Sequence, residues 1–152
     1  MADNSALKQQ ILFTDLTDTE LGMIAQKIVI ESYSKGQSIF REGEQTGGIY
    51  LVKKGKVEIS KQTPDGWKQT LAVITENQIF GELSVIENKK THGADATALE
   101  ATDLYLFTTD KFKALEKSDP ATMYKIMRTI ARLASKNVHS MNDKLVKLLI
   151  SY

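Results

Sequence analysis

The chain has 152 residues, of which 41% are hydrophobic and 26% are charged, and its net charge at pH 7 is +1. This length and composition are typical of one globular domain whose hydrophobic core is large enough to fold without disulfide bonds or a structural metal. The sequence has no cysteine, which excludes disulfide bonds and thiolate metal sites. The first residues lack a signal-peptide pattern, and no apolar run reaches the roughly 20 residues that span a bilayer. We therefore expect a cytoplasmic protein that does not enter membranes.

The charge is unevenly distributed along the chain. From Pro120 onward one acid, Asp143, stands against six bases, namely Lys125, Arg128, Arg132, Lys136, Lys144 and Lys147. This segment therefore carries +5, and the rest of the chain carries −4. Basic segments bind nucleic acids or membranes in some proteins, but a solvated helix face is the more common explanation and the one we favour.

Residues 17–29 are predicted to form a helix. Thr17 or Asp18 can cap its N-terminus, and Glu20 stands where a capping box needs an acid. The apolar residues that share one face of this helix are Leu21, Ile24, Ala25 and Ile28. Residues 1–12 are assigned to an N-terminal extension.

From about residue 30 to residue 109 the sequence changes to short β-rich segments separated by glycines. The predicted strands are Val29–Ser34, Ser38–Phe40, Gly48–Lys53, Lys56–Gln62, Lys68–Ile74, Ala94–Leu99 and Asp103–Thr108. We interpret Lys54-Gly55 as a two-residue hairpin turn and Thr63-Pro64-Asp65-Gly66 as a second tight turn. Short strands at these intervals predict a double-sheet jelly roll.

Two further helices are predicted, at Asp110–Lys117 and Pro120–Ile150, with Asp119 as a candidate N-cap before a proline at the first helical position. The second would be about 45 Å long. One face of this helix carries a stripe of apolar residues that is interrupted by a single polar residue, Asn137. The residues of the stripe are Met123, Met127, Ile130, Ala134, Asn137, Met141 and Leu148. We interpret this stripe as a parallel homodimer contact, with Asn137 as a polar register mark. Packing against the chain's own β-roll is the alternative.

One stretch carries the chemistry, Phe80-Gly81-Glu82-Leu83-Ser84 followed by His92-Gly93-Ala94. A short helix beginning near Gly81 would direct free backbone N–H groups at an anion, and glycine would let that backbone approach closely. The Glu82 carboxylate can accept a hydrogen bond from a ribose hydroxyl, or it can simply be a solvated first-turn acid. We favour the ligand role for Glu82, and core packing for Phe80 and Leu83.

The order of these elements resembles the cyclic nucleotide-binding domain of catabolite activator proteins, kinase regulatory subunits and cyclic-nucleotide-gated channels. Besides the Phe80–Ala94 stretch, the resemblance rests on Ser38–Glu44, on Ile49–Val57 as a central hairpin, and on Ala98–Tyr105 as a strand pair. It covers about Phe13 to Asn142. It implies a mainly β fold, a double-stranded β-helix or jelly roll flanked by an N-terminal helix and a long C-terminal helix. Residues 13–118 would form the β-roll with its N-terminal helix, and residues 119–152 the long helix.

The resemblance also implies a ligand, cAMP or cGMP, held by Phe80, Gly81, Glu82, Leu83, Ser84, His92, Gly93 and Ala94. Similar domains have an arginine and then a small hydroxyl residue where this chain has His92 and Gly93. Arginine brings a permanent charge and a two-pronged donor, whereas histidine is only partly charged near neutral pH. Three interpretations stay open. His92, Lys89 or Lys90 supplies the positive charge, ligand binding has been lost, or the site holds a different anion.

No catalytic constellation is recognisable, because His92 and His139 lie far apart in sequence and the acids are scattered. We therefore predict no enzyme activity, no metal and no cofactor. Catabolite activators carry a helix-turn-helix after their long helix, and we expect none here because the sequence ends at Tyr152. We predict a regulatory domain that couples a ligand at the Gly81-Glu82 turn to the final helix, which an unknown protein would read. The alternative is a degenerate domain that serves only in dimerisation or protein contact.

Overall fold

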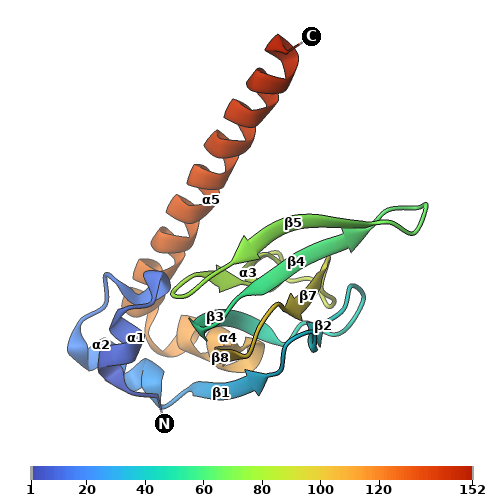
Figure 1. Cartoon of the computed structure of the whole chain (residues 1–152). Coiled ribbons are helices and arrows are strands. Elements are labelled where there is room, and N and C mark those ends of the chain that lie inside the picture. Colours follow the sequence, from blue (N-terminus) through green and yellow to red (C-terminus); the bar gives the residue numbers. More distant parts are fainter. Residues whose placement is uncertain (1, 152) are drawn as a thin grey trace.

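The structure is a computed structural model, and it describes residues 2–151. Two four-stranded antiparallel sheets form a β-roll, short helices cover one end of it, and a long C-terminal helix projects away from it (Figure 1). The strand order is β1-β8-β3-β6 in the first sheet and β2-β7-β4-β5 in the second. The predicted mainly β jelly roll with an N-terminal helix and a long C-terminal helix is confirmed.

The predicted strands are all present, with ends that differ by at most one residue. They are β1 (Ile28–Tyr33), β2 (Ser38–Phe40), β3 (Gly48–Lys54), β4 (Val57–Gln62), β5 (Lys68–Ile74), β7 (Asp95–Ala98) and β8 (Thr102–Thr108). The structure adds β6 (Ile79–Phe80), which is too short for a pattern of alternating residues to reveal. Phe80 therefore lies in a strand, two residues before the short helix α3 (Glu82–Ile86).

The predicted hairpin at Lys54-Gly55 is wrong. β3 pairs with β8 and β6, whereas β4 pairs with β5 and β7, so the chain changes sheets at Gly55. A Cβ atom on Gly55, at φ +105°, would lie 2.4 Å from the Thr102 hydroxyl oxygen. Glycine is needed because another segment packs against this corner. The segment Ala98–Tyr105 likewise crosses from β7 in one sheet to β8 in the other and is not a pair of bonded neighbours.

The second predicted turn does close a hairpin, between β4 and β5. The Thr63 N–H donates to the Trp67 carbonyl at 2.8 Å, and Gly66 takes the left-handed conformation at φ +84°. This hairpin extends outward from the roll (Figure 1), and Trp67 at its tip is largely exposed.

The N-terminal segment forms α1 (Asn4–Lys8), the short 3-10 helix η1 (Ile11–Phe13) and α2 (Asp18–Ala25). The capping box between Thr17 and Glu20 is present, as predicted. Helix α2 ends four residues earlier than predicted, because Ile28 already pairs with Phe107 in β1. No element was predicted for residues 1–12, yet Leu7 in α1 is completely buried.

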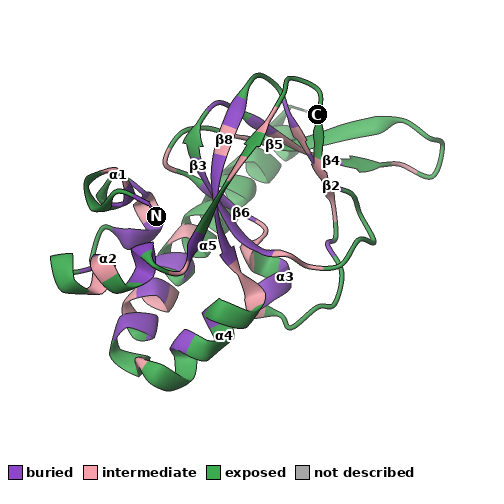
Figure 2. Ribbon diagram, turned by 90° about the horizontal axis from the view of Figure 1, so that it is seen from below, coloured by how far each residue is buried: buried purple, intermediate pink, exposed green. Residues whose placement is uncertain are grey.

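Two apolar clusters form the core. The larger joins the helices to the first sheet, and the smaller lies in the roll around Phe40, Tyr50 and Phe80. Buried residues accordingly gather where helices meet strands, whereas the β4–β5 hairpin is mostly exposed (Figure 2). We call the three neighbouring rings of the smaller cluster, Phe40, Tyr50 and Phe80, the aromatic cluster, and it is the part of the core that lies next to the candidate site.

Helices α4 (Thr109–Ser118) and α5 (Pro120–Ile150) follow β8, and the predicted Asp119 cap on α5 is present. The first half of α5 is fastened to the N-terminal segment. Lys125 Nζ lies 2.7 Å from Glu20 Oε1, and this bond, with that from the Thr17 N–H, lowers the pKa of Glu20 to about 2. Asp15 is paired with Arg128 and Arg132, each at 3.3 Å. Three of the six bases after Pro120 therefore hold the helix to its own domain.

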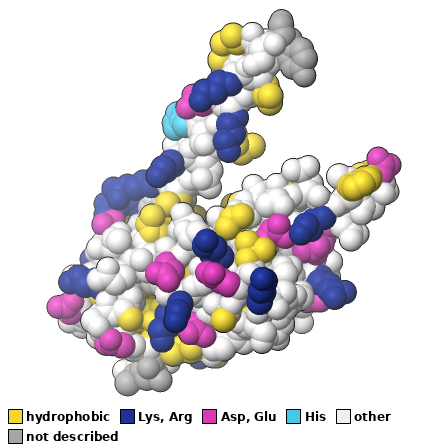
Figure 3. All heavy atoms as spheres, viewed as in Figure 1, with side chains coloured by type: hydrophobic (Ala, Val, Ile, Leu, Met, Phe, Trp, Pro, Cys, Tyr) yellow, Lys and Arg dark blue, Asp and Glu magenta, His cyan; other side chains and the backbone are white. Residues whose placement is uncertain are grey.

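The second half of α5 leaves the domain. Every residue from Ala134 to Ile150 is exposed, and basic and hydrophobic side chains alternate along this part of the helix (Figure 3). Met123 and Ile130 are buried against the chain's own core. The start of the predicted stripe therefore follows the alternative of packing on the roll, and Asn137 is exposed in the single chain.

Candidate functional site

The first part of the candidate site is the junction between β6 and α3. Gly81, the N-cap of α3, has φ +80°, and a Cβ atom there would lie 2.9 Å from the Gly48 carbonyl oxygen. The junction therefore requires glycine both for its conformation and for the close approach of the Gly47-Gly48 segment. Phe80 is buried and stacks on Tyr50 at 5.0 Å, which confirms its predicted core role.

The residues after Gly81 differ sharply in exposure. Leu83 is 59% exposed, so the prediction that it packs in the core is wrong. Ser84 is buried in the same short helix. Glu82 is half-buried, and the loss of solvent around its carboxyl raises the pKa of that group. A raised pKa weakens Glu82 as a charged acceptor.

His92 lies in the aromatic cluster and is only 3% exposed. Its ring stacks on Phe40, with centroids 3.5 Å apart and planes 8° apart, and Tyr50 lies beside it at 6.4 Å. Its Nε2 atom accepts a hydrogen bond from the Gly47 N–H at 3.3 Å, so the ring proton lies on Nδ1. Burial lowers the pKa of His92, and the nearby Glu44 opposes this only in part. Burial and the accepting Nε2 atom therefore both favour the neutral imidazole.

The two parts of the predicted site, Phe80–Ser84 and His92–Ala94, both contact the segment Gly47-Gly48. Gly81 contacts the Gly48 carbonyl, and His92 binds the Gly47 N–H. The pair Gly47-Gly48 is thus part of the site, as is Phe40, and neither was among the predicted site residues. Two adjacent glycines were the available signal, because they permit a close backbone approach.

The rest of the predicted site lies in the loop before β7. Gly93 is exposed, and a Cβ atom there would meet nothing within 4 Å, so a side chain would fit. Ala94 is half-buried. Lys89 forms a 2.8 Å ion pair with Glu87, and Lys90 is exposed. Neither lysine is directed to the site by any contact among the described residues.

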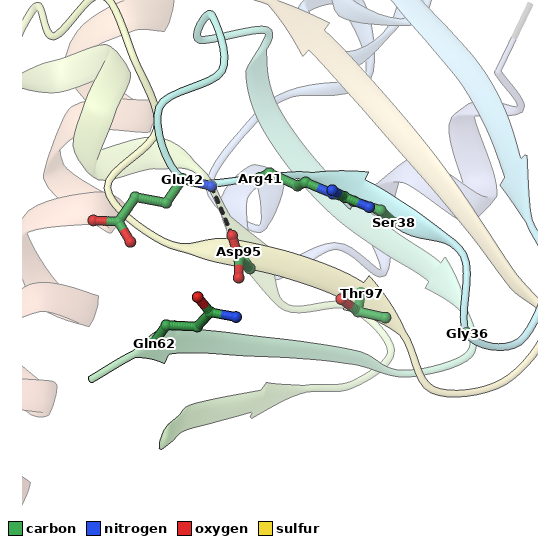
Figure 4. A pocket seen from close by; sticks show the side chains of 7 residues that line it. All are labelled: Gly36, Ser38, Arg41, Glu42, Gln62, Asp95 and Thr97. Atoms are coloured by element: carbon green, nitrogen blue, oxygen red, sulfur yellow. Dashed lines mark hydrogen bonds between the residues drawn. The ribbon is translucent and has the colours of Figure 1, made fainter. Parts of the chain in front are cut away.

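A polar cleft of about 630 Å³ lies elsewhere on the roll, across β2, β4 and β7 (Figure 4). It is lined by Gly36, Ser38, Arg41, Glu42, Gln62, Asp95 and Thr97, none of which was predicted as a site residue. Asp95 Oδ1 accepts the Glu42 backbone N–H at 2.7 Å. One guanidinium against two carboxylates gives the cleft no excess positive charge, so it does not suit a phosphate.

Among residues 2–151 no helix is long and apolar enough to cross a membrane. The same residues contain no group of three or more His, Asp or Glu side chains placed to hold a metal ion.

The antiparallel roll, the glycine turn that opens α3 and the long final helix together have the arrangement of a cyclic nucleotide-binding domain. The model of the cyclic nucleotide-binding domain matches residues 30–119 of this sequence. The chain belongs to the cyclic nucleotide-binding domain family.

Individual relatives agree with this assignment. The cyclic AMP receptor protein of Thermus thermophilus is 28% identical over 126 residues, which cover 83% of this chain and 58% of that protein. The crystal structure of the Thermus thermophilus catabolite activator protein has a TM-score of 0.77 at 26% identity, covering 91% of this chain and 63% of that one. A cyclic nucleotide-binding domain from Methylobacillus flagellatus has the same fold, with a TM-score of 0.83 at 19% identity, covering 94% of this chain and 84% of that one.

This chain therefore spans less than two thirds of the length of the Thermus thermophilus receptor protein. The family is regulatory and not catalytic.

Proposed function

We propose that this chain is a cytoplasmic regulatory domain, without catalytic activity, whose nucleotide pocket is closed by His92 and which acts through a homodimer formed by α5. At neutral pH it binds cAMP and cGMP only weakly. The observation that carries this proposal is the position of His92, which is buried, stacked on Phe40 and bonded to Gly47 as a neutral acceptor.

A cyclic phosphate needs positive charge or well-placed donors. The Nε2 atom of His92 is an acceptor here and offers a phosphate nothing, and the Gly47 N–H is already used by that nitrogen. Loss of one charged hydrogen bond typically costs about 1.5–3 kcal/mol, or at least tenfold in affinity. Displacing the imidazole from its stack would add to that cost, because the 3.5 Å stacking contact with Phe40 would be lost.

The distal half of α5 supports the dimer. Its exposed apolar side chains Val138, Met141, Leu145 and Leu148 follow one another at spacings of three, four and three, as in a coiled-coil seam. A helix of this length that projects into water with apolar residues uncovered is not stabilised by its own fold. A second copy pairing in parallel would cover the same residues on both chains, and the helix would carry the signal to a partner protein.

Calorimetry of the wild-type protein and of His92→Arg with cAMP and cGMP at pH 7.5 tests the closed pocket. Arginine is always charged, and burying an unpaired charge where the imidazole lies is unfavourable, so the guanidinium would turn outward. We expect His92→Arg to bind at least tenfold more tightly than the wild type. Because Gly93 has room for a side chain, His92→Arg combined with Gly93→Ser should bind at least as well as the single variant.

Tight binding by the wild type at pH 7.5 would refute the closed pocket. The near-isosteric His92→Gln variant is the matched control, since it removes the imidazole without supplying a charge and should not gain affinity.

A further inference from the structure

Two loops are fastened to each other around His92. The His92 N–H donates to the Glu44 carbonyl and the Gly43 N–H donates to the His92 carbonyl, each at 2.9 Å. Two residues along, the Thr46 N–H donates to the Lys90 carbonyl, also at 2.9 Å. The bond from Gly47 to the His92 ring closes this set, and it is the only one of these bonds that uses a titratable side chain.

Gly47 also links the site to the C-terminal helices. Its carbonyl accepts the N–H of Thr109, the first residue of α4, at 3.1 Å. Its Cα lies against the Tyr50 hydroxyl, since a Cβ atom there would be 2.7 Å from that oxygen. Gly47 is therefore held on one side by the His92 ring and on the other by the start of α4, which leads directly into α5.

We propose that His92 is a proton-operated latch between the pocket and α4. A proton added to Nε2 turns the acceptor of the Gly47 N–H into a second donor, so that two N–H groups face each other. The imidazolium then leaves its place on Phe40, and Gly47, released from the ring, loosens its hydrogen bond with Thr109. Acid would thereby change the support of α4 and α5 without any ligand.

The surroundings of the ring favour the neutral, latched form at pH 7. Phe40 in β2 is apolar, and burial raises the pKa of Tyr50 in β3 to about 12, so Tyr50 stays uncharged. Glu44, in the facing loop, is the one acid that acts on the ring, and it favours protonation. Lys89 and Lys90 in the ring's own loop are exposed. Because burial depresses the pKa of His92 in the folded state, the latch contributes stability above about pH 6.5 and loses it as the pH falls through the folded pKa.

An amide NMR titration of the ligand-free protein from pH 8 to pH 5 tests the latch. We expect the Gly47 and Thr109 amide signals to move together, with one midpoint below the ordinary pKa of histidine, because burial lowers the pKa of His92. In His92→Gln both movements should disappear, because glutamine can occupy the pocket but does not titrate. In Glu82→Gln both movements should persist. This variant shows that the movements do not come from titration of Glu82, the half-buried acid of the site.

Gly47 and Thr109 signals that stay constant over this range would overturn the latch, as would movements that survive in His92→Gln. A Gly47 signal that moves while Thr109 does not would overturn the link to α4. The inference concerns the same pocket as the proposed function but is tested without nucleotide. Weak nucleotide binding together with amide signals that do not move would mean that the latch fails and the closed pocket holds. Tight nucleotide binding together with moving amide signals would mean that the closed pocket fails and the latch holds.

Discussion

Gly48→Ala is expected to lower the stability of the domain by about 3 kcal/mol, or roughly 10 °C in melting temperature. A Cβ atom on Gly48 would lie 2.2 Å from the Phe107 carbonyl oxygen and 2.8 Å from the Thr108 Cα. Both are backbone atoms of β8, which is the central partner of β3, so neither can move aside as a flexible side chain could. Thermal denaturation followed by circular dichroism measures the effect.

Gly66→Ala is the matched control. Both glycines have a positive φ, +155° at Gly48 and +84° at Gly66, but nothing lies within 4 Å of the Cβ position of Gly66. That variant should lose only the conformational cost of a left-handed alanine, about 1 kcal/mol. Equal losses in the two variants would show that Gly48 is needed for its backbone angle alone and that the close contact between β3 and β8 is wrong.

Leu145→Lys is expected to convert the proposed homodimer into a monomer. Leu145 is 55% exposed in the single chain and lies in the middle of the seam that we propose between two copies of α5. Two lysines brought together there would place like charges in an apolar contact, which a coiled coil does not tolerate without large loss of affinity. Sedimentation velocity at several protein concentrations would resolve the two species.

His139→Lys provides the comparison for the dimer. It adds the same lysine to the same helix, but about 120° around the helix from Leu145 and four residues before Asp143. It should remain dimeric. A wild-type protein that sediments as a monomer at all concentrations would end the proposal of an α5 dimer, and so would monomers from both variants alike.

The elements of this fold could be predicted from the sequence better than their pairing. Alternating residues and the turn at Thr63–Gly66 located every strand except β6 to within one residue. Lys54-Gly55 has the composition of a hairpin turn, but its glycine serves a contact with Thr102, 47 residues further along the chain. Such a contact is invisible in a local pattern. The end of helix α2 could not be predicted for the same reason. Ile28 continues the apolar face of the helix in the sequence pattern, but in the structure it lies in β1 and pairs with Phe107.

The candidate site could be located from the sequence, but its state could not. The stretch from Phe80 to Ala94 does form the β6–α3 junction and the loop before β7, as the family resemblance implies. Whether His92 points outward to a ligand or inward depends on Phe40 and Gly47, which lie 52 and 45 residues away in sequence. In the inward position the neutral ring stacks on Phe40 and accepts the Gly47 N–H. Arginine has no acceptor for that N–H and would bury a permanent charge.

The central claim is that a neutral, buried His92 closes the pocket at physiological pH. Nitrogen-15 NMR of the two histidine rings at pH 7.5 tests it most directly, with His139 as the exposed internal reference. We predict that His92 shows a single tautomer with a proton on Nδ1 and an unprotonated Nε2 that accepts a hydrogen bond, while His139 shows the averaged signals of a solvated ring. A His92 ring that is protonated at this pH, or that averages its tautomers as His139 does, would contradict the account.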